Sequence, residues 1–332
     1  MMGLEQSRTM PFSQSHHVDR VEAALASKSA ASSALVASWR RSSGTHHLDP
    51  AGHHPTRRLT ESELKRARQS VEPLLRVAQA TLDRLFLAVG GAGCCVLLAD
   101  RNGVPIDRRG VAADDRTFES WGLWQGSVWS EDSEGTNGIG TCIVEQRPLT
   151  IHRDEHFFAR NTLLSCTTAP IFDHEGNLAA ALDVSSCRAD LIEGFVGLVS
   201  VAVSDAARRI EADHFRTSFP NARIMLAPVP GSQSSVLLAV DVDDIIVGAS
   251  RSARQKLGIT QALIDRGTPV GRFVSEATSD TRDALVNAER GVLQRALAQA
   301  NGNVSVTAKA LGLSRATLHR KLKRTGIASG NR

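Results

Sequence analysis

The feature that most constrains the fold is the run ERGVLQRALAQANGNVSVTAKALGLSRATLHRKLKRTGI at residues 289–327. Its first part carries apolar residues at helical spacing, and the Asn-Gly-Asn cluster at 301–303 is expected to end that helix. The apolar positions are Val292, Leu293, Ala296 and Leu297. A short second helix is expected next, with Val304, Ala308 and Leu311 on its apolar face.

A glycine turn and a strongly basic third helix follow. Gly312 suits the left-handed conformation that closes a helix, and Ser314 can accept free amide hydrogens at the start of the next one. Leu318 and Leu322 lie one turn apart and are expected to point inward. The outer surface is left to Arg315, Thr317, His319, Arg320, Lys321, Lys323 and Arg324. This pattern predicts a helix-turn-helix whose last helix can enter the major groove of double-stranded DNA.

The charge distribution agrees with this interpretation. Of the chain's 39 lysines and arginines, nine lie at 289–332 with a single acidic residue, which leaves 30 basic and 34 acidic residues elsewhere. Only the C-terminal part therefore has the positive charge of a phosphate-binding surface. A basic helix can also be a merely solvated surface, but the caps, the turn and the inward leucines together favour DNA binding.

The same residues resemble the Fis-type DNA-binding domain, from the Gly-Asn at 302–303 through Leu-Gly-Leu-Ser-Arg to the closing Gly-Ile. Two positions depart from the family pattern: Ala316 where threonine is common, and His319 where tyrosine is common. The resemblance implies a homodimer on a partly palindromic site. It also implies which residues face DNA, namely Ser314, Arg315, Thr317, His319, Arg320, Lys321 and Lys323.

Composition sets the remaining bounds. With 332 residues, 42% of them hydrophobic and 22% charged, the chain has the make-up of a soluble protein of two or three domains. The N-terminal residues contain no apolar stretch of the kind that a secretory signal needs, and the uncharged run at 85–99 is too short for a membrane helix. We expect a cytoplasmic protein without a membrane partner.

The five cysteines show no metal-binding spacing. Neighbouring Cys94 and Cys95 on a strand would point to opposite faces, and we interpret all five thiols as small core residues. Two alternatives stay open: a redox or metal sensor at Cys142 or Cys166, and a thiol enzyme pairing one of them with a nearby histidine (His152, His156 or His174). We predict no catalytic residue, no metal and no cofactor.

Residues 1–58 form a polar leader with a helical patch near 21–40, and a sensor domain is expected at 59–215. Thr60 and Glu63 form a predicted capping box, and Pro73 is expected to separate two helices. Strands are expected at 94–100, from Val104, and at 148–152, 165–173 and 178–186, with a closing helix at 189–213. Helices flanking antiparallel strands predict an α+β sensor domain.

A long insert between these strands holds Trp121, Trp124 and Trp129 and then a glycine-rich stretch at 130–141. Such aromatic residues beside a mobile stretch could form a lid over a ligand cavity, or they could be ordinary core, and the pattern favours neither. Residues 133–186 resemble the GAF domain of acetoin-catabolism-type regulators, as do Ser-Trp-Arg-Arg-Ser at 38–42 and Gly-Val-Pro-Ile at 103–106. The resemblance implies a small-molecule effector, for which we predict contacts from Trp121, Trp124, Trp129, Asn137 and His156.

Residues 235–259 resemble the beginning of a PAS domain, with Asp244 where glycine is usual and Ser250 where asparagine is common. We assign 216–280 to a linker and a degenerate PAS-like segment, and 281–332 to the DNA-binding domain. The expected fold class is α+β: a GAF-type antiparallel-sheet sensor domain, a short PAS-like α/β segment and a C-terminal all-α helix-turn-helix.

Regulators of this type usually carry a central AAA+ ATPase, but no GxxxxGK[ST] phosphate loop occurs anywhere in this chain. We therefore predict a dimeric, sequence-specific transcriptional regulator whose DNA binding responds to an effector, without ATPase-driven activation through a sigma factor. Activation would need direct contact with RNA polymerase. The alternative is an ATPase-less partner or dominant-negative modulator of a full-length regulator.

Overall fold

The computed structural model describes residues 12–27, 33–188, 193–227, 229, 236–274, 281–300 and 302–327. The chain divides into two compact units, one ending at Thr268 and one beginning at Pro269. The fold class predicted from the sequence is confirmed: the first unit has antiparallel sheets with helices, and the described residues of the second unit form helices.

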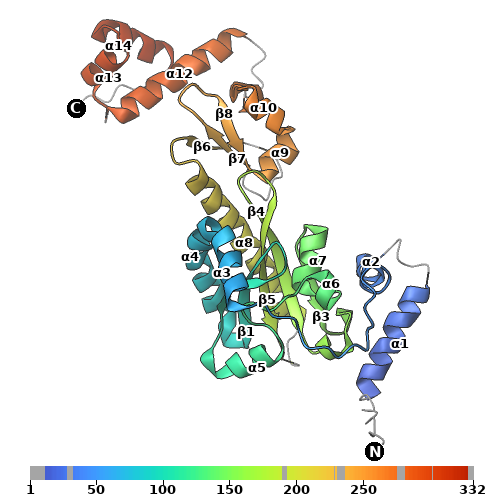
Figure 1. Cartoon of the computed structure of the whole chain (residues 1–332). Helices are drawn as coiled ribbons and strands as arrows, with labels where there is room; N and C mark the ends of the chain where they lie inside the picture. The colour runs from blue at the N-terminus through green and yellow to red at the C-terminus, as the bar shows by residue number, and fades with distance from the viewer. Residues whose placement is uncertain are drawn as a thin grey trace, which may run out of the picture. The chain divides into compact units, whose positions relative to one another are not determined.

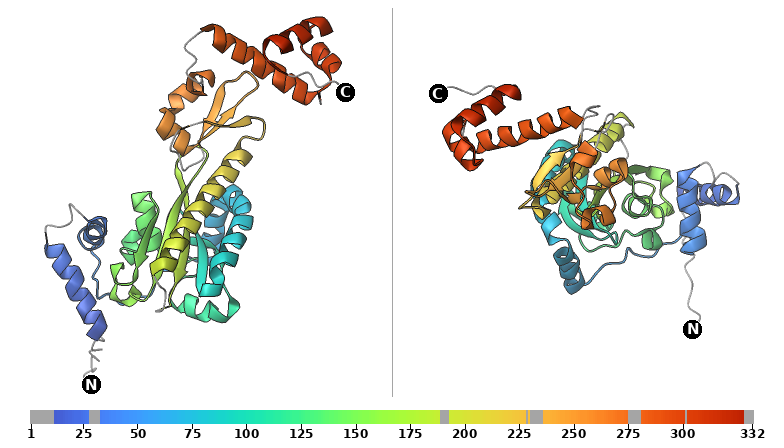
Figure 2. Two further views of the ribbon diagram at one scale, coloured as in Figure 1. Left: turned by 180° about the vertical axis from the view of Figure 1, so that it is seen from behind. Right: turned by 90° about the horizontal axis from the view of Figure 1, so that it is seen from above.

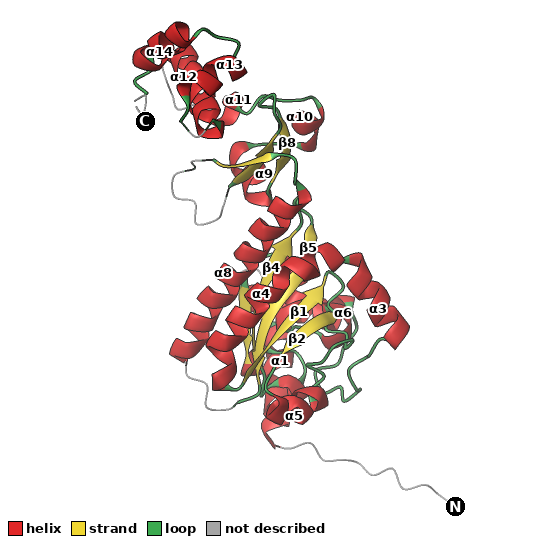
Figure 3. Ribbon diagram, turned by 90° about the vertical axis from the view of Figure 1, so that its left-hand side faces the viewer, coloured by secondary structure: helices red, strands yellow, loops and turns green. Residues whose placement is uncertain are grey.

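A five-stranded antiparallel sheet, here called the main sheet, organises the first unit in the order β2-β1-β5-β4-β3 (Figures 1 and 3). Its strands are β1 (Cys94–Asp100), β2 (Pro105–Arg109), β3 (Leu149–His152), β4 (Ser165–Phe172) and β5 (Leu178–Ser186). All five were predicted from their apolar, β-branched runs. The Asn-Gly turn between β1 and β2 has Gly103 at φ +78°, as its hairpin requires.

One face of the main sheet is covered by α4 (Glu72–Val89) and α8 (Glu193–Ser218), which pack side by side (Figure 2). Before α4, helix α3 (Glu61–Ser70) begins at Thr60 with the predicted capping box, because the Glu63 carboxylate accepts the Thr60 amide at 2.8 Å. Pro73 lies in the first turn of α4, so the predicted separation of two helices is confirmed. The first residues expected in α8, 189–192, lie outside the described residues.

The opposite face is covered by three short helices of the insert: α5 (Asp115–Ser120), α6 (Glu131–Glu134) and α7 (Gly138–Glu145). The glycine-rich stretch thus forms packed, buried helices. Cys94 belongs to the core on the α4 and α8 face and Cys95 to the core on this one, which confirms their opposite orientation.

The leader is more structured than expected. Helix α1 (Phe12–Ala26) precedes α2 (Ala34–Arg40), which runs into a π-helical turn at Arg41–Thr45. The single helical patch predicted at 21–40 is therefore two helices, with 28–32 outside the described residues. Val21 and Trp39 pack with Phe157 and Phe158, so the leader shares a small core with the connection between β3 and β4.

A second, three-stranded sheet, here called the small sheet, has the order β6-β7-β8. Its strands are β6 (Arg223–Leu226), β7 (Leu237–Val240) and β8 (Ile246–Ala249), followed by α9 (Arg251–Leu257) and α10 (Gln261–Asp265). The two strands and α9 were predicted, whereas β6 was missed. Asp244 has φ +62°, which explains why glycine is usual at that position of the turn. Phe215 and Ala212 of α8 pack on this sheet.

The second unit contains α11 (Gly271–Val274), α12 (Thr281–Gln299), α13 (Val304–Ala310) and α14 (Arg315–Arg324) (Figure 1). Helices α12 to α14 are those expected from the sequence. Within the described ranges, no helix is long and apolar enough to cross a membrane.

Candidate nucleic-acid interface and sensor site

Helix α14 begins at the predicted turn. Ser314 Oγ accepts the Thr317 amide at 3.1 Å, and Gly312 before it has φ +64°. At α13, Asn303 Oδ1 accepts the Ser305 and Val306 amides at 3.0 and 3.1 Å. Both helices of the motif therefore begin at a side-chain cap, which fixes where each one starts.

A compact apolar core holds the three helices together. Leu293 of α12, Ala308 of α13, and Leu318 and Leu322 of α14 are all at most 4% exposed. The two leucines of α14 point inward as predicted. Because they hold one side of α14 against α12 and α13, its other sides are presented outward.

The residues predicted to face DNA lie on or beside that outward surface. Ser314, Arg315, His319, Arg320 and Lys323 are exposed, and Thr317 and Lys321 are half-buried. Lys321 differs in one further respect: its ammonium pairs with the Glu289 carboxylate of α12, which also pairs with Arg324. The sequence analysis named Glu289 as the first residue of the motif but did not predict its pairing with Lys321 and Arg324. Contact with DNA stays a prediction for all seven residues.

Inside the first unit, polar side chains gather on the insert-facing side of the main sheet. Thr168 Oγ1 donates to Asp183 Oδ1 at 2.5 Å, and Ser185 Oγ lies 2.6 Å from Asp183 Oδ2 and 3.1 Å from Cys166 Sγ. His156 Nε2 lies 3.5 Å from that sulfur, and its Nδ1 lies 2.9 Å from the Arg153 carbonyl. We call these five side chains the buried polar row: His156, Cys166, Thr168, Asp183 and Ser185.

Burial determines the protonation of this row. It raises the pKa of the Asp183 carboxyl to about 6, although the hydroxyls of Ser185 and Thr168 oppose the shift. It lowers the pKa of His156 to about 4 and raises that of the Cys166 thiol well above its usual range. The structure thus brings Cys166 and His156 together, but as a neutral thiol and a neutral imidazole. A thiol in this environment is a poor nucleophile.

The start of α7 packs directly on the buried polar row. Asn137 caps this helix, since its Oδ1 accepts the Gly140 amide and its Nδ2 donates to the Gly135 carbonyl, both at 2.8 Å. A Cβ on Gly138 would lie 2.6 Å from Cys166 Cβ and 2.7 Å from Thr168 Oγ1. Glycine at this position is what allows the helix to approach the sheet so closely. Two of the predicted effector-binding residues, Asn137 and His156, are therefore buried where α7 packs on the main sheet.

The three tryptophans of the insert occupy different surroundings. Trp129 is 1% exposed in the core of this face and donates to the Gly122 carbonyl at 2.7 Å. Trp124 lies under the Arg108 guanidinium, 4.3 Å from ring centre to Cζ. Trp121 borders a surface hollow of about 430 Å³ together with Arg160 and Asn161. The structure does not bring the three rings to one cavity, and their contact with an effector stays a prediction.

The leader is attached to the insert by a buried carboxylate that sequence reasoning missed. The side chain of Glu131 accepts from Arg41 Nε at 2.8 Å and from the hydroxyl of Ser38. Thr141 Oγ1 of α7 donates to the same carboxylate at 3.3 Å. In the run Ser-Glu-Asp-Ser-Glu, Glu131 looks like one of several solvated charges, and only its pairing with the Ser-Trp-Arg-Arg-Ser segment could have marked it.

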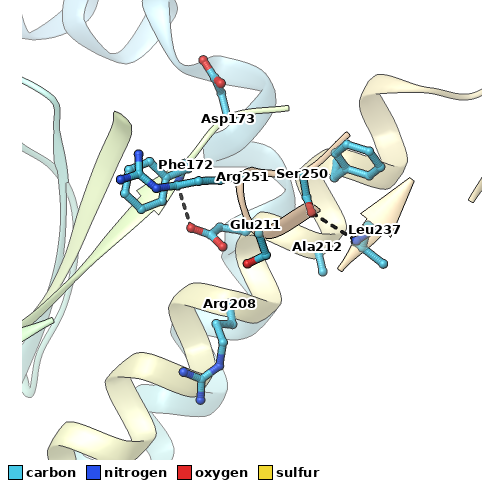
Figure 4. Close-up of a pocket in the computed structure, with 10 residues that line it drawn as sticks. Phe172, Asp173, Arg208, Glu211, Ala212, Leu237, Ser250 and Arg251 are labelled. Carbon is cyan, nitrogen blue, oxygen red and sulfur yellow. Dashed lines mark hydrogen bonds between the residues drawn. The ribbon is translucent and has the colours of Figure 1, made fainter. Parts of the chain in front are cut away.

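The two sheets of the first unit meet at Arg251, the first residue of α9 (Figure 4). Its guanidinium lies 3.7 Å from the ring centre of Phe172, at the end of β4, and donates to Gln146 Oε1 at 3.1 Å. The Phe172 amide donates to Glu211 Oε1 at 2.9 Å, and burial raises the pKa of Glu211 to about 7. Gln146 directly follows α7, and Phe172 is the last residue of β4, which carries Cys166 and Thr168 of the buried polar row. Arg251 therefore contacts the ends of both elements.

Among the described residues, no group of three or more histidine, cysteine or carboxylate side chains is arranged to hold a metal ion. All five cysteines are free, and four of them are buried.

Two family models match the chain in the places that the sequence indicated. Residues 73–210 match the GAF domain, and residues 284–324 match the bacterial regulatory proteins of the Fis family. The chain therefore contains a GAF domain followed by a Fis-type helix-turn-helix, as predicted.

The chain is also similar to transcriptional regulators that are much longer. It is 33% identical over 261 residues to the acetoin catabolism regulatory protein of Cupriavidus necator, a match that covers 75% of this chain and 39% of that protein. It is 26% identical to the acetoin dehydrogenase operon transcriptional activator AcoR of Bacillus subtilis, over 54% of this chain and 29% of that one. The matches thus span well under half of either relative.

Among solved structures, the chain resembles one in the crystal structure of the E. coli DhaR(N)–DhaL complex. The match has a TM-score of 0.50 at 12% identity and covers 74% of this chain and 80% of that one. At this identity the likeness concerns the fold alone.

Proposed function

We propose that this chain is a sequence-specific, DNA-binding transcriptional regulator whose affinity for its operator depends on a small molecule bound by the GAF domain. The observation that carries the proposal is α14, a capped basic helix held by two inward leucines within a match to the Fis family. Exposed Arg315, Arg320 and Lys323 on such a helix supply the charge and the hydrogen-bond donors that DNA recognition needs.

The sensing half of the proposal rests on the GAF match and on the contacts around the buried polar row. An effector that favours one position of α7 would shift Gln146 at the end of that helix. The shift would change the hydrogen bond between Gln146 and Arg251. A coupling free energy of 1–3 kcal/mol, the usual scale for allosteric effects, would change operator affinity about 5- to 150-fold.

A two-fold symmetric operator would require a dimer, which we propose as the active form in the cytoplasm. Because the chain has no GxxxxGK[ST] loop, we propose regulation without ATP hydrolysis: repression by occupancy of the site, or activation through direct contact with RNA polymerase. For the domain organisation we keep 59–215 for the sensor, 216–280 for the linker and PAS-like segment, and 281–332 for DNA binding.

The proposal is tested by titrating candidate small molecules against the complex of the full chain with its operator, followed by fluorescence anisotropy. A regulator of this kind changes operator affinity at least fivefold with one class of compound. Operator binding that no compound alters would remove the sensing half and leave a constitutive DNA-binding protein.

The second candidate is a partner of a longer regulator, favoured by the likeness to relatives more than twice as long and by the missing phosphate loop. Co-purification of the tagged chain with a full-length relative separates the two functions. A stable mixed dimer supports the partner function, and exclusive homodimers contradict it.

A further inference from the structure

Glu289 is the single acidic residue at 289–332, and it lies on α12, which packs against the cationic helix α14. Its carboxylate takes one cation on each oxygen: the Lys321 ammonium on Oε1 and the Arg324 guanidinium on Oε2. The Glu289 side chain is only 19% exposed, and these two partners lower its pKa below the usual range. Glu289 is therefore ionised and neutralises two of the five cationic side chains of α14.

Helical geometry places the two cations that Glu289 binds on different parts of α14. Successive residues are about 100° apart around a helix, so the side opposite the buried Leu318 and Leu322 is centred on Arg320, with Ala316 and Arg324 about 40° to either side and Lys323 about 60° away. Lys321 lies on the flank, where its ammonium meets the Glu289 carboxylate of α12. Arg324 belongs to the outward side, and its guanidinium turns back to the same carboxylate. Arg315, Arg320 and Lys323 have no acidic side chain beside them among the described ion pairs.

From this arrangement we infer that Glu289 weakens the electrostatic attraction of α14 for DNA by withholding Lys321 and Arg324 from the phosphates. The inference rests on the proposed function. Each cation that neutralises a phosphate releases counterions, and this sequence-independent term dominates non-specific binding. Withholding two cations therefore lowers affinity for every sequence alike and makes binding less dependent on salt.

A second consequence concerns position. The same carboxylate joins the middle of α12 to the C-terminal half of α14, so it fixes the rotation of α14 about its axis together with the two inward leucines. Lys321, which the family resemblance places at the DNA, thereby acts as a positioning residue rather than as a phosphate ligand.

The test compares wild type, Glu289→Gln, Lys321→Ala and Lys323→Ala in the full-length chain. Affinities for an operator duplex and for a scrambled duplex of equal length are measured between about 0.05 and 0.3 M KCl, and log K is plotted against log salt. Asp205→Asn, an exposed carboxylate on α8, is the control for one unit of added net charge outside the DNA-binding unit.

Glu289→Gln is expected to steepen the salt slope by about 1.8, the value for two added phosphate contacts, and to tighten binding to both duplexes by about tenfold at about 0.3 M KCl. Lys321→Ala is expected to leave the slope within half a unit of wild type, while Lys323→Ala lowers it by about 0.9. Asp205→Asn is expected to behave as wild type. Circular dichroism of each variant confirms that α14 is intact before the slopes are compared.

The inference is overturned if Lys321→Ala lowers the slope as much as Lys323→Ala does, or if Glu289→Gln leaves the slope unchanged. If the wild-type chain prefers its operator, either of these results refutes only the role of Glu289 and leaves the proposed function standing. A wild-type chain without any preference for the operator instead refutes the proposed function.

Discussion

Arg41 of the leader and Glu131 of the insert form a two-point contact, with Nε to Oε2 at 2.8 Å and Nη2 to Oε1 at 3.0 Å. Ninety residues separate them in the sequence, and the Glu131 side chain is only 1% exposed. Such charge-assisted, bidentate pairs are among the stronger polar contacts in proteins. The leader is therefore bound to the sensor domain and contributes to its stability.

Glu131→Gln is expected to lower the free energy of unfolding of the first unit by about 1–3 kcal/mol, the scale for hydrogen bonds to a charged group. The reason is that Arg41 loses its buried carboxylate and keeps only Glu145. Urea unfolding followed by tryptophan fluorescence measures this, because all four tryptophans lie in the first unit. Glu72→Gln, which removes an exposed pair with Arg76, is the matched control and should cost under about 0.5 kcal/mol. Equal losses in both variants would show that the leader contact adds nothing special.

Gly138→Ala is expected to destabilise the first unit by about 1–3 kcal/mol, as overpacked cores usually do. The added Cβ would lie 2.6 Å from Cys166 Cβ, so α7 would have to move away from the main sheet. Gly197→Ala on α8 is the control, because nothing lies within 4 Å of its added Cβ and helix propensity alone predicts a gain of about 0.5–1 kcal/mol. The same urea experiment decides the question. A neutral Gly138→Ala would mean that α7 is not tightly packed on the buried polar row.

Asp183 and His156 change the free energy of unfolding with pH in opposite directions, over nearly the same pH interval. The pKa of Asp183 is raised from 3.8 to about 6 in the fold, so the folded chain keeps a proton that the unfolded chain has lost, and stability falls as pH rises between these values. The pKa of His156 is lowered from 6.5 to about 4, so the unfolded chain takes up a proton first, and stability falls as pH drops through this range. In wild type the two effects largely oppose each other.

Asp183→Asn removes the first effect and leaves that of His156. The free energy of unfolding of the variant minus that of wild type is therefore expected to rise by on the order of 3 kcal/mol between pH 4 and pH 6. The difference between the two proteins is the informative quantity, since Glu211, whose pKa is raised to about 7, has the same pH dependence in both. A difference that stays flat over this interval would show that Asp183 is ionised in the fold from pH 4 upward.

Arg315→Ala and Lys323→Ala are expected to weaken DNA binding in different ways. Arg315 is the first residue of α14, at the end that we propose to enter the groove, so its loss should cost about 1–3 kcal/mol on the operator and relax specificity. Lys323 should weaken all sequences alike and lower the salt slope by about 1. Anisotropy titrations with operator and scrambled duplexes distinguish the two effects. Identical behaviour of both variants on both duplexes would refute this division.

Much of the fold could be predicted because its signals are local. Strand β5 and strand β1 have the predicted bounds, since apolar β-branched runs between turn residues specify strands. The capping box at Thr60 and the caps at Ser314 and Asn303 depend on residues three positions apart or fewer. The helix-turn-helix could therefore be recognised from the sequence together with its inward and outward surfaces.

The features that were missed depend on contacts between distant segments. Strand β6 is half-exposed and short, and its place is decided by pairing with β7. The stretch at 130–141 carries three glycines, yet Gly138 and Gly140 allow α7 to approach the main sheet and the backbone before α6 closely. Glu131 and Glu289 look like surface charges until their partners, 90 and 32 residues away, are placed beside them.

The central claim is that this chain recognises particular DNA sites through α14. The most direct measurement is sequencing of genomic DNA fragments captured by the purified full-length protein, with Arg315→Ala in parallel. A limited set of two-fold symmetric sites that the variant fails to enrich is the expected result. Diffuse, salt-sensitive capture that is the same for wild type and variant would contradict the claim.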